Sequence, residues 1–315
     1  MNLKIVILAA GQGTRMKSKI PKVLHKVLDK PMLDHVMEAA QVVTNNKPIV
    51  VIGHMSDMVR EHLGDKAEIA LQEEQLGTGH AVMMAEHYID DEDEVLILCG
   101  DTPLIKGETL KEMTKIKSEG YAAVVMSAVE DDPTGYGRII RDESNDFMRI
   151  REQKDASEEE KAIKEINAGM YIINGKLLKE NLSKLSVNNA QREYYLTDVL
   201  EHIKNAGHRI GVYQADKMEI MGVNSRLQLS EAERIMRLDV NKMHMANGVT
   251  LIDTNSTYID KNVKIGRDTI IYPNCHIKGN SVIGEDCIIR ENTTIEDSHI
   301  EDQINKKSST ILSSK

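Results

Sequence analysis

KIVILAAGQGTRM, residues 4–16, begins with an apolar run and continues directly into a turn that contains two glycines. An apolar run of this length before glycine predicts a buried β-strand that ends in a loop. Gly11 and Gly13 allow the backbone to approach a ligand closely, and Arg15 places a positive charge beside it. Lys22 adds a second positive charge shortly after the turn. The stretch therefore predicts a strand whose carboxyl end binds an anionic group such as a phosphate.

The alternation of strand and helix recurs up to about residue 225. Apolar runs predict strands at residues 49–53, 95–99 and 122–128, and helical patterns fill residues 32–43, 78–88 and 108–118. Strands separated by such helices pair in parallel through right-handed crossovers, so the expected fold class is α/β, a mostly parallel sheet with helices on both faces. Ligands of these sheets bind at the carboxyl ends of the strands. The segments after Ala10 and Cys99 are therefore candidate binding loops.

A long helix and a different repeat follow this region. Helix-forming residues run from Ser225 to about Ala246, before the stop signal Asn247-Gly248, and predict a connecting helix. Isoleucine then recurs every six residues, at positions 259, 265, 271, 277, 283, 289 and 295, and the repeat fades after Ser298. A period of six is typical of a hexapeptide β-helix, in which residues 259, 277 and 295 stack on one face. The predicted domains are 1–225, the linker helix 226–247 and a short β-helix over 248–315.

Composition excludes several classes of function. The 315 residues carry a net charge of −10, which disfavours non-specific nucleic-acid binding because that needs a surplus of Lys and Arg. The three cysteines form no CxxC pair and the histidines show no zinc spacing. Cys275 and Cys287 are therefore expected to be packing residues. No apolar stretch reaches the length of a membrane span, and residues 3–10 are too short for a signal peptide, so a cytoplasmic protein is predicted.

Five motifs occur in a fixed order along the chain: LAAGQGTRM (8–16), PKVLH (21–25), LQEEQLGTGHA (71–81), CGDTPLI (99–105) and MGVNSRLQL (221–229). With the linker helix and the start of the repeat, they resemble the GlmU-type bifunctional enzymes, which join a GlcNAc-1-phosphate uridyltransferase to a glucosamine-1-phosphate acetyltransferase. The resemblance implies a Rossmann-like nucleotidyltransferase domain over residues 1–225 and a left-handed parallel β-helix. It also implies formation of UDP-GlcNAc and pyrophosphate from UTP and GlcNAc-1-phosphate, with Mg²⁺ as cofactor.

The resemblance further implies which residues bind the nucleotide. The uracil and ribose are expected to contact Leu8, Ala10, Gly11, Gln72, Gly77 and Thr78. The amide of Gln72 can donate and accept at once, as the edge of uracil requires, although its position is explained equally well by an ordinary loop. Arg15 and Lys22 are implied as the catalytic cations that neutralise the phosphates. Gln12 stands where the family often has Lys, which lowers the positive charge near the triphosphate.

Asp101 and Asn224 are implied as ligands of Mg²⁺, and Asn224 also as a substrate contact. Asp101 lies two residues past a predicted strand, and carboxylate and amide oxygens suit a hard cation that keeps water and shares phosphate ligands. Asn224 is also explained as the N-cap of the long helix, and the two roles can coexist.

The sugar is expected to contact Gly137, Glu152 and Asn167, which lie in GYGRI, REQKDA and EINAGMY. Carboxylate and amide groups suit sugar hydroxyls and an acetamido group. Tyr195 and Thr197 also match the family, but a helix start capped by Thr197 explains them equally well.

The acetyltransferase half of the family depends on later coils of the β-helix, and the sequence stops before them, so acetyl transfer is expected to be absent. His276 and His299 are expected to be surface residues of the coil. The family also implies a homotrimer formed through the β-helix. Two alternatives stay open: the same reaction on another sugar 1-phosphate, such as glucose 1-phosphate with UTP or dTTP, and a catalytically silent scaffold. Joint retention of Arg15, Lys22, Asp101 and Asn224 disfavours the scaffold.

Overall fold

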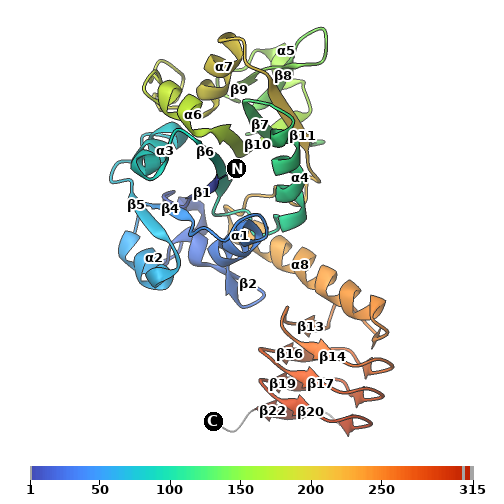
Figure 1. Cartoon of the computed structure of the whole chain (residues 1–315). Helices are drawn as coiled ribbons and strands as arrows, with labels where there is room; N and C mark the ends of the chain where they lie inside the picture. The colour runs from blue at the N-terminus through green and yellow to red at the C-terminus, as the bar shows by residue number, and fades with distance from the viewer. Residues whose placement is uncertain (1, 307–308, 313–315) are drawn as a thin grey trace. The chain divides into compact units, whose positions relative to one another are not determined.

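A nine-stranded sheet organises the first part of the chain (Figure 1), within the residues that the computed structural model describes, 2–306 and 309–312. Its main path follows the order β11-β7-β10-β6-β1-β4-β5, and the β8–β9 hairpin pairs with β10. The pairs along this path are parallel except those made by β10. The strands are β1 (Asn2–Leu8), β4 (Ile49–Ile52), β5 (Glu68–Leu71), β6 (Asp93–Cys99), β7 (Ala123–Val129), β8 (Arg138–Arg141), β9 (Phe147–Arg151), β10 (Glu165–Asn174) and β11 (Ile210–Gln214). The predicted mostly parallel sheet is confirmed.

Helices pack on both faces of this sheet, as the sequence predicts. They are α1 (Met32–Gln41), α2 (Ser56–Leu63), α3 (Thr78–Ala85), α4 (Gly107–Ser118), α5 (Glu158–Lys161), α6 (Gly175–Leu182) and α7 (Thr197–Asn205). One hydrophobic cluster joins α1, α2 and α4 to one face, and a second joins α3, α6 and α7 to the other. Successive residues of β1 point to opposite faces, so Ile5 and Ile7 enter the first cluster and Val6 enters the second. Burial on both faces explains why the strands read as continuous apolar runs.

The shorter elements lie in the connections. They are the 3₁₀-helices η1 (Thr14–Met16), η2 (Lys22–Leu24), η3 (Gly64–Lys66) and η4 (Glu86–Tyr88) and the strands β2 (Lys26–Val27) and β3 (Lys30–Pro31). The predicted helix at 78–88 is thus an α-helix that ends at Ala85 and continues as η4. None of the described helices is both long and apolar enough to cross a membrane.

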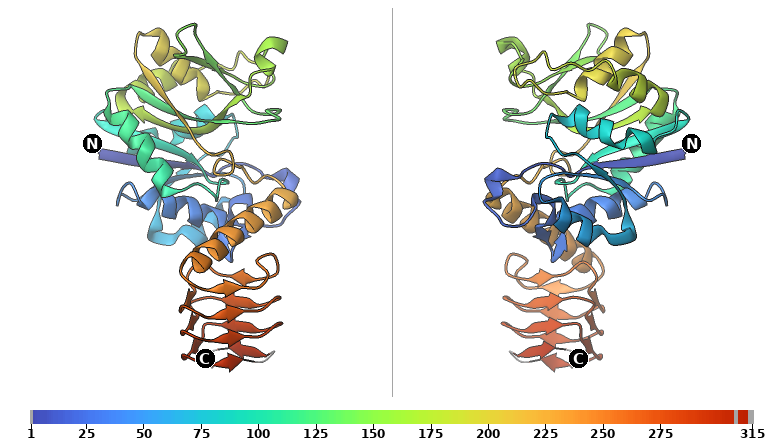
Figure 2. Two further views of the ribbon diagram at one scale, coloured as in Figure 1. Left: turned by 90° about the vertical axis from the view of Figure 1, so that its right-hand side faces the viewer. Right: turned by 90° about the vertical axis from the view of Figure 1, so that its left-hand side faces the viewer.

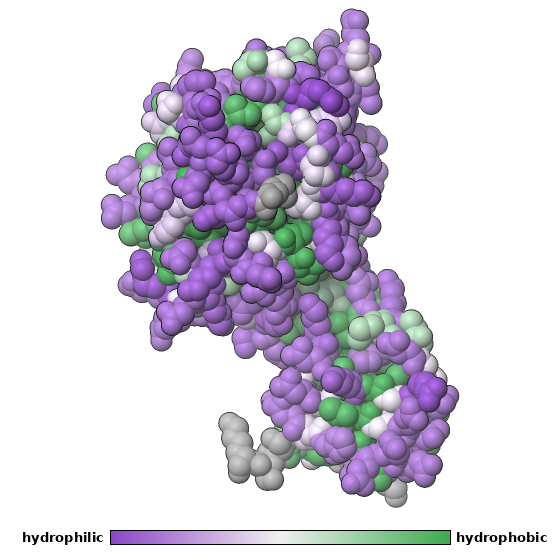
Figure 3. Space-filling view, viewed as in Figure 1, coloured by the Kyte–Doolittle hydropathy of each residue, from purple (hydrophilic) through white to green (hydrophobic). Residues whose placement is uncertain are grey.

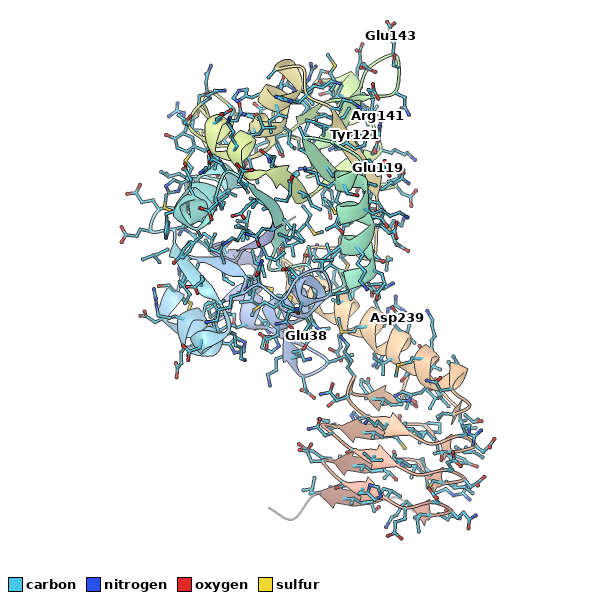
Figure 4. The ribbon with its side chains drawn as sticks, in the orientation of Figure 1. Glu38, Glu119, Tyr121, Arg141, Glu143 and Asp239 are labelled. Carbon is cyan, nitrogen blue, oxygen red and sulfur yellow. The ribbon has the colours of Figure 1, made fainter. Side chains whose placement is uncertain are left out.

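An ion pair anchors the β8–β9 hairpin to the sheet. Arg141 of β8 donates from Nε to Glu165 Oε2 and from Nη2 to Glu165 Oε1, each at 2.7 Å. Figure 4 shows Arg141 on this hairpin and Glu143 at its tip. Two parallel hydrogen bonds between guanidinium and carboxylate fix direction as well as distance. The hairpin therefore stays beside β10, and Gly137 and Glu152, two of the residues expected to bind the sugar, directly flank it.

Contacts divide the chain into two units: residues up to His25 with Lys30–Gln228, and Lys26–Asp29 with the residues from Leu229 on. The long helix α8 (Arg226–Ala246) begins one residue after Ser225. The predicted domain limits at 225 and 247 stay predictions.

The second unit contains three parallel sheets, β12-β15-β18-β21, β13-β16-β19-β22 and β14-β17-β20, stacked coil on coil (Figures 1 and 2). Their strands are β12 (Thr250–Leu251), β13 (Tyr258–Ile259), β14 (Lys264–Ile265), β15 (Ile270–Ile271), β16 (His276–Lys278), β17 (Val282–Ile283), β18 (Ile288–Ile289), β19 (Thr294–Glu296), β20 (His299–Ile300), β21 (Asn305–Lys306) and β22 (Thr310–Leu312). Ile259, Ile277 and Ile295 pair in register, as the six-residue period predicts. The hexapeptide β-helix is confirmed.

The coil continues past the point where the sequence repeat fades. Ile283 pairs with Ile300 and Ile295 pairs with Ile311, so these later coils are shorter than the earlier ones. Ile300 is buried, and Ile304 and Ile311 pack against the same core, although Lys306 is the residue opposite Ile289. The isoleucine spacing of the sequence thus changes after Ser298, while the described residues continue the predicted β-helix as far as Leu312. Residues 307–308 and 313–315, which complete the predicted β-helix, lie outside them.

The cysteines and histidines of the β-helix have structural surroundings. Cys275 and Cys287 are buried in its core, as predicted for packing residues. His276 is half-buried and stacks on Tyr258 with ring centroids 4.5 Å apart. Burial lowers the pKa of His276, and the charges of Lys278 and Arg237 lower it further. His299 is exposed on β20.

Candidate active site

A cavity of about 270 Å³ opens where β1, β5 and β6 end. Leu8 is the last residue of β1, Cys99 is the last residue of β6, and Gln72 follows directly after β5. The cavity is lined by Leu8, Ala9, Ala10, Gly11, Lys22, Val23, Gln72, Gln75, Gly77, Thr78, Ala81, Cys99, Asp101 and Glu193. It therefore lies at the carboxyl edge of the parallel strands, where such sheets bind ligands.

The residues expected to bind the nucleotide come together in this cavity. Leu8, Ala10 and Gly11 form one wall, and Gln72, Gly77 and Thr78 come from the loop and helix that follow β5. Gln72 is a loop residue by its backbone, yet its side chain is only 3% exposed. Its Nε2 donates to the carbonyl oxygen of Gly77 at 3.1 Å. This bond orients the Gln72 amide at the wall of the cavity.

Gly77 has a conformation and surroundings that only glycine tolerates. Its φ is 110° and its ψ is 175°, a region that side chains do not adopt without strain. A Cβ at this position would lie 2.6 Å from the carbonyl oxygen of Tyr194. The next residue, Thr78, begins α3 and accepts the Leu196 N–H on Oγ1 at 3.2 Å. The β5–α3 loop is thus held against the segment that leads into α7.

The Lys22 ammonium is a cationic centre at the edge of the cavity, and two oxygens contact it. The Lys22 ammonium contacts Asp101 Oδ2 at 2.5 Å and Asn224 Oδ1 at 2.9 Å. The Lys22 and Asp101 side chains are only 13% and 18% exposed. The oxygens of Asp101 and Asn224 thus converge on one positive charge. Carboxylate and amide oxygens placed in this way also suit a hard metal ion. Within the described residues no group of three or more His, Cys, Asp or Glu could hold a metal by itself, so further ligands would come from substrate or water.

Asn224 does not cap α8. The Ser225 hydroxyl accepts the Gln228 N–H at 3.2 Å and so occupies the capping position. The Asn224 backbone N–H donates to Gln228 Oε1 at 2.9 Å, while its side chain turns toward Lys22. The N-cap interpretation of Asn224 is therefore wrong, because Ser225 caps the helix and leaves the Asn224 amide free to contact the cationic centre.

The residues expected to bind the sugar lie beside one another: Gly137 directly precedes β8, Glu152 directly follows β9, and the backbone N–H of Asn167 in β10 donates to the Gly137 carbonyl oxygen at 2.8 Å. A Cβ added to Gly137 would lie 3.3 Å from Glu152 Oε1, so the backbone there approaches the carboxylate closely. Burial raises the pKa of Glu152, the Thr197 hydroxyl lowers it, and the charges of Asp155, Asp198 and Glu193 raise it. Glu152 therefore keeps its proton at a higher pH than an exposed glutamate.

Thr197 contacts Glu152 and does not cap a helix. It is the first residue of α7, Leu196 precedes it at the cap position, and that end has no side-chain cap. Thr197 Oγ1 lies 3.5 Å from Glu152 Oε1. Both residues line a smaller cavity of about 100 Å³ together with Tyr195, whose hydroxyl donates to Asp155 Oδ2 at 3.2 Å. The capping interpretation of Thr197 was wrong.

Arg15, one of the two predicted catalytic cations, does not line the cavity, and neither does Asn224. Arg15 is exposed on η1, and both are absent from the described residues that line the cavity. Gln12, the departure from the family pattern, lies nearby with Nε2 3.4 Å from Gln75 Oε1.

Sequence reasoning missed several lining residues, including Val23, Gln75 and Glu193. Gln75 stands in the quoted LQEEQLGTGHA motif and could have been found there. Glu193 had no sequence signal, because it reaches the cavity through contacts of residues 193–194 with the distant loop at residues 76–79. Cys99 also lines the cavity, and burial raises the pKa of its thiol to about 12, with the Asp101 charge contributing. The thiol stays protonated and does not act as a nucleophile.

Comparison with known proteins gives two family matches and close relatives. The nucleotidyl transferase family matches residues 4–219, and the bacterial transferase hexapeptide (six repeats) family matches residues 262–297. The bifunctional protein GlmU of Clostridioides difficile is 53% identical over 100% of this chain and 69% of its own length. GlmU of Caldanaerobacter subterraneus is 54% identical over 98% of the chain and 68% of its length. GlmU of Enterococcus faecalis is 48% identical over 98% of the chain and 68% of its own length.

Proposed function

This chain belongs to the GlmU family of nucleotidyl transferases, and we infer from this membership that it is a UDP-GlcNAc pyrophosphorylase. It transfers the uridylyl group of UTP to GlcNAc-1-phosphate, forms UDP-GlcNAc and releases pyrophosphate. The observation that ties this reaction to a place in the fold is the cavity at the strand ends, with Lys22, Asp101 and Asn224 joined at its edge.

The proposed reaction is a direct displacement. An oxygen of the sugar phosphate attacks the α-phosphorus of UTP in line with the leaving pyrophosphate, so no protein nucleophile is required. The protein contributes by positioning two polyanions and by stabilising charge on the phosphates. We assign the binding of uracil and ribose to the cavity wall formed by Leu8, Ala10, Gly11, Gln72, Gly77 and Thr78.

Positive charge comes from two side chains and a metal. We propose that Lys22, at the cavity wall, neutralises the phosphates and that Arg15, exposed on η1, adds charge from the solvent side. The family implies a divalent metal, and we propose Mg²⁺ held by Asp101 and Asn224. When bound, this ion supplies positive charge to the phosphate oxygens.

The sugar site is proposed at Gly137, Glu152 and Asn167. Glu152 is half-buried and lies 3.5 Å from the Thr197 hydroxyl, and the backbone of Gly137 passes close to it. A carboxylate and an amide at this place can bind sugar hydroxyls and an acetamido group. This pairing favours GlcNAc-1-phosphate over glucose 1-phosphate.

We also propose a homotrimer formed through the β-helix, and a cytoplasmic location. In support of the first, Figure 3 shows apolar residues at the surface of the β-helix. Tyr258 and Ile252 are among the exposed large apolar residues of this unit. Exposed apolar surface of this kind is typical of subunit interfaces.

Pyrophosphate release tests the function. The purified chain is incubated with UTP, GlcNAc-1-phosphate and Mg²⁺, and release is compared with reactions that contain glucose 1-phosphate, dTTP or EDTA. Release that needs metal and is greatest with UTP and GlcNAc-1-phosphate is expected. Greater release with another sugar 1-phosphate or with dTTP would show that the proposed substrate is wrong. No release of pyrophosphate from folded protein with any of these substrates would favour a silent scaffold. Acetyl transfer is measured separately with acetyl-CoA and glucosamine 1-phosphate.

A further inference from the structure

Strand β10 contains a bulge that brings two of its polar side chains together. Asn167 pairs with Ser127 of β7, whereas Tyr171 pairs with Val125, so the β10 segment between them is longer than the β7 segment that it faces. Such a bulge re-aims side chains locally. Gly169 lies inside it with a φ of 72°, a conformation that glycine adopts readily.

The side chains of Asn167 and Tyr171 contact each other directly across the bulge. Asn167 Nδ2 donates to the Tyr171 hydroxyl oxygen at 2.7 Å, and the same hydroxyl lies 3.1 Å from Asn167 Oδ1. The backbone N–H of Gly169 donates to Asn167 Oδ1 at 3.0 Å. A backbone N–H can only donate, so the atom that faces it must be the amide oxygen. These contacts fix the orientation of the Asn167 amide, with Oδ1 facing the Gly169 N–H and Nδ2 facing the Tyr171 hydroxyl.

The amide therefore has a defined polarity. Oδ1 receives the Gly169 N–H, and one of the two Nδ2 hydrogens is directed at Tyr171. Among the described residues, Asn167 Nδ2 donates to the Tyr171 hydroxyl alone. The second hydrogen on Nδ2 is therefore left to donate to a ligand. Asn167 is thus prepared to donate to an acceptor oxygen.

Tyr171 lies beside other residues of the site. It is 3% exposed, and burial raises the pKa of its hydroxyl, to which the charges of Glu152 and Cys99 add. Cys99 Sγ, at the wall of the nucleotide cavity, donates to the carbonyl oxygen of Gly169 at 3.4 Å. The bulge is therefore tied to the cavity through Cys99. The Asn167 N–H, which donates to the Gly137 carbonyl oxygen at 2.8 Å, ties it to the segment beside Glu152.

We propose that Tyr171 is a positioning residue, which holds the Asn167 amide with its N–H directed at an acceptor oxygen of the sugar 1-phosphate. This rests on the proposed function and on the placement of the sugar at Asn167. Tyr171 itself does not touch the substrate. Its hydroxyl acts through the orientation of the amide, so its loss weakens sugar binding and leaves nucleotide binding unchanged.

The first test is Tyr171→Phe, which removes one hydroxyl and keeps the ring in the core. The KM for GlcNAc-1-phosphate is expected to rise about fivefold to tenfold, the usual effect of losing one hydrogen bond, while the KM for UTP changes less than about twofold. Tyr88→Phe is the matched control, because the Tyr88 hydroxyl donates to the Ile69 carbonyl oxygen at 3.2 Å and touches no proposed site residue. An unchanged KM for the sugar phosphate in Tyr171→Phe, or an equal rise in Tyr88→Phe, would overturn the proposal.

A double-mutant cycle separates positioning from a general structural effect. In an Asn167→Ala background, Tyr171→Phe is expected to cause no further rise in the KM for GlcNAc-1-phosphate, because there is no amide left to orient. A second rise as large as the first would refute the proposal.

Asn167→Asp tests the polarity even if Tyr171→Phe does not fold. Aspartate still accepts the Gly169 N–H but cannot donate to the sugar, so the KM for GlcNAc-1-phosphate is expected to rise at an unchanged KM for UTP. A normal KM would overturn the proposal. Wild-type enzyme that turns over no sugar 1-phosphate would instead refute the proposed function, and this inference with it.

Discussion

Lys22 joins two oxygens that are remote in sequence, those of Asp101 and Asn224, at the edge of the nucleotide cavity. Lys22 begins η2, Asp101 lies two residues after β6, and Asn224 lies two residues before α8. Little water reaches Lys22 and Asp101, so the attraction between them is stronger than on an exposed surface. At the scale of single residues, the edge of the cavity is thus built on one half-buried ion pair and one amide.

Asp101→Ala is expected to abolish turnover. It removes one of the two oxygens that converge on the cationic centre, and loss of such a group lowers kcat by about 10²-fold to 10³-fold or more. The measurement is pyrophosphate release at saturating Mg²⁺, with circular dichroism to verify the fold. Asp91→Ala, which removes an exposed carboxylate paired with Lys179, is the control and should keep wild-type activity. Full activity of Asp101→Ala would refute its role as a metal ligand.

The pH dependence of sugar binding follows from Glu152. Because burial raises its pKa in the folded protein, Glu152 takes up its proton at a higher pH than an exposed glutamate. As the pH falls through this raised pKa, the charged acceptor is lost, so the KM for GlcNAc-1-phosphate is expected to rise.

Steady-state kinetics between about pH 5 and pH 8, a range that lies above the ordinary glutamate pKa, measures this effect. Glu152→Gln is the control, because its side chain does not titrate while the sugar phosphate titrates equally in both enzymes. Its KM should be raised throughout and should depend less on pH. Parallel profiles for the two enzymes would exclude Glu152 as the titrating group.

At the scale of elements, the ends of the strands and the turns that follow them build the site. The loop between β5 and α3 supplies Gln72, Gln75, Gly77 and Thr78 to one wall of the cavity. Its path depends on Gly77, where the backbone adopts a conformation that side chains avoid and passes close to Tyr194. The loop therefore has little freedom to accept a larger residue.

Gly77→Ala is expected to destabilise the protein by about 2–4 kcal/mol, the combined cost of backbone strain and of the clash with Tyr194. It should also raise the KM for UTP, because Gly77 lines the cavity. Gly120→Ala is a matched control, since Gly120 has a φ of 90° but open space where a Cβ would lie. It should cost about 1 kcal/mol, from strain alone. Chemical denaturation measures both, and equal losses would show that the clash contributes nothing.

At the scale of the whole molecule, the chain contains two different architectures, of which only the second is built from a sequence repeat. The first unit buries both faces of one sheet under helices, whereas the second stacks coils whose isoleucines fill a narrow interior. The second unit also leaves large apolar residues such as Ile252 and Tyr258 exposed. The protein spans about 69% of the length of the GlmU relative from Clostridioides difficile.

Self-association is the prediction that belongs to this scale. Sedimentation velocity of the full chain is expected to show a species of three chains that persists at high salt, because apolar contacts do not weaken with ionic strength. Dissociation by salt would instead indicate a charged interface. A single-chain species at every concentration would contradict the trimer.

Much of the fold follows from the sequence alone, because periodicity is local. Apolar runs specified the strands on both sides of each helix, and the six-residue spacing specified that Ile259, Ile277 and Ile295 stack. The ordered motifs also indicated the family, which the relatives confirm. These signals lie within short stretches of chain and need no knowledge of distant contacts.

The tertiary structure alone decided how distant residues meet. Lys22 bridges Asp101 and Asn224, Ser225 takes the cap that the sequence assigned to Asn224, and Glu193 reaches the nucleotide cavity. The bulge in β10, with Tyr171 against Asn167, has no signature in a pattern of apolar residues. Such contacts depend on the order of strands in the sheet and on local departures from its register, so they arise only when the whole domain has packed.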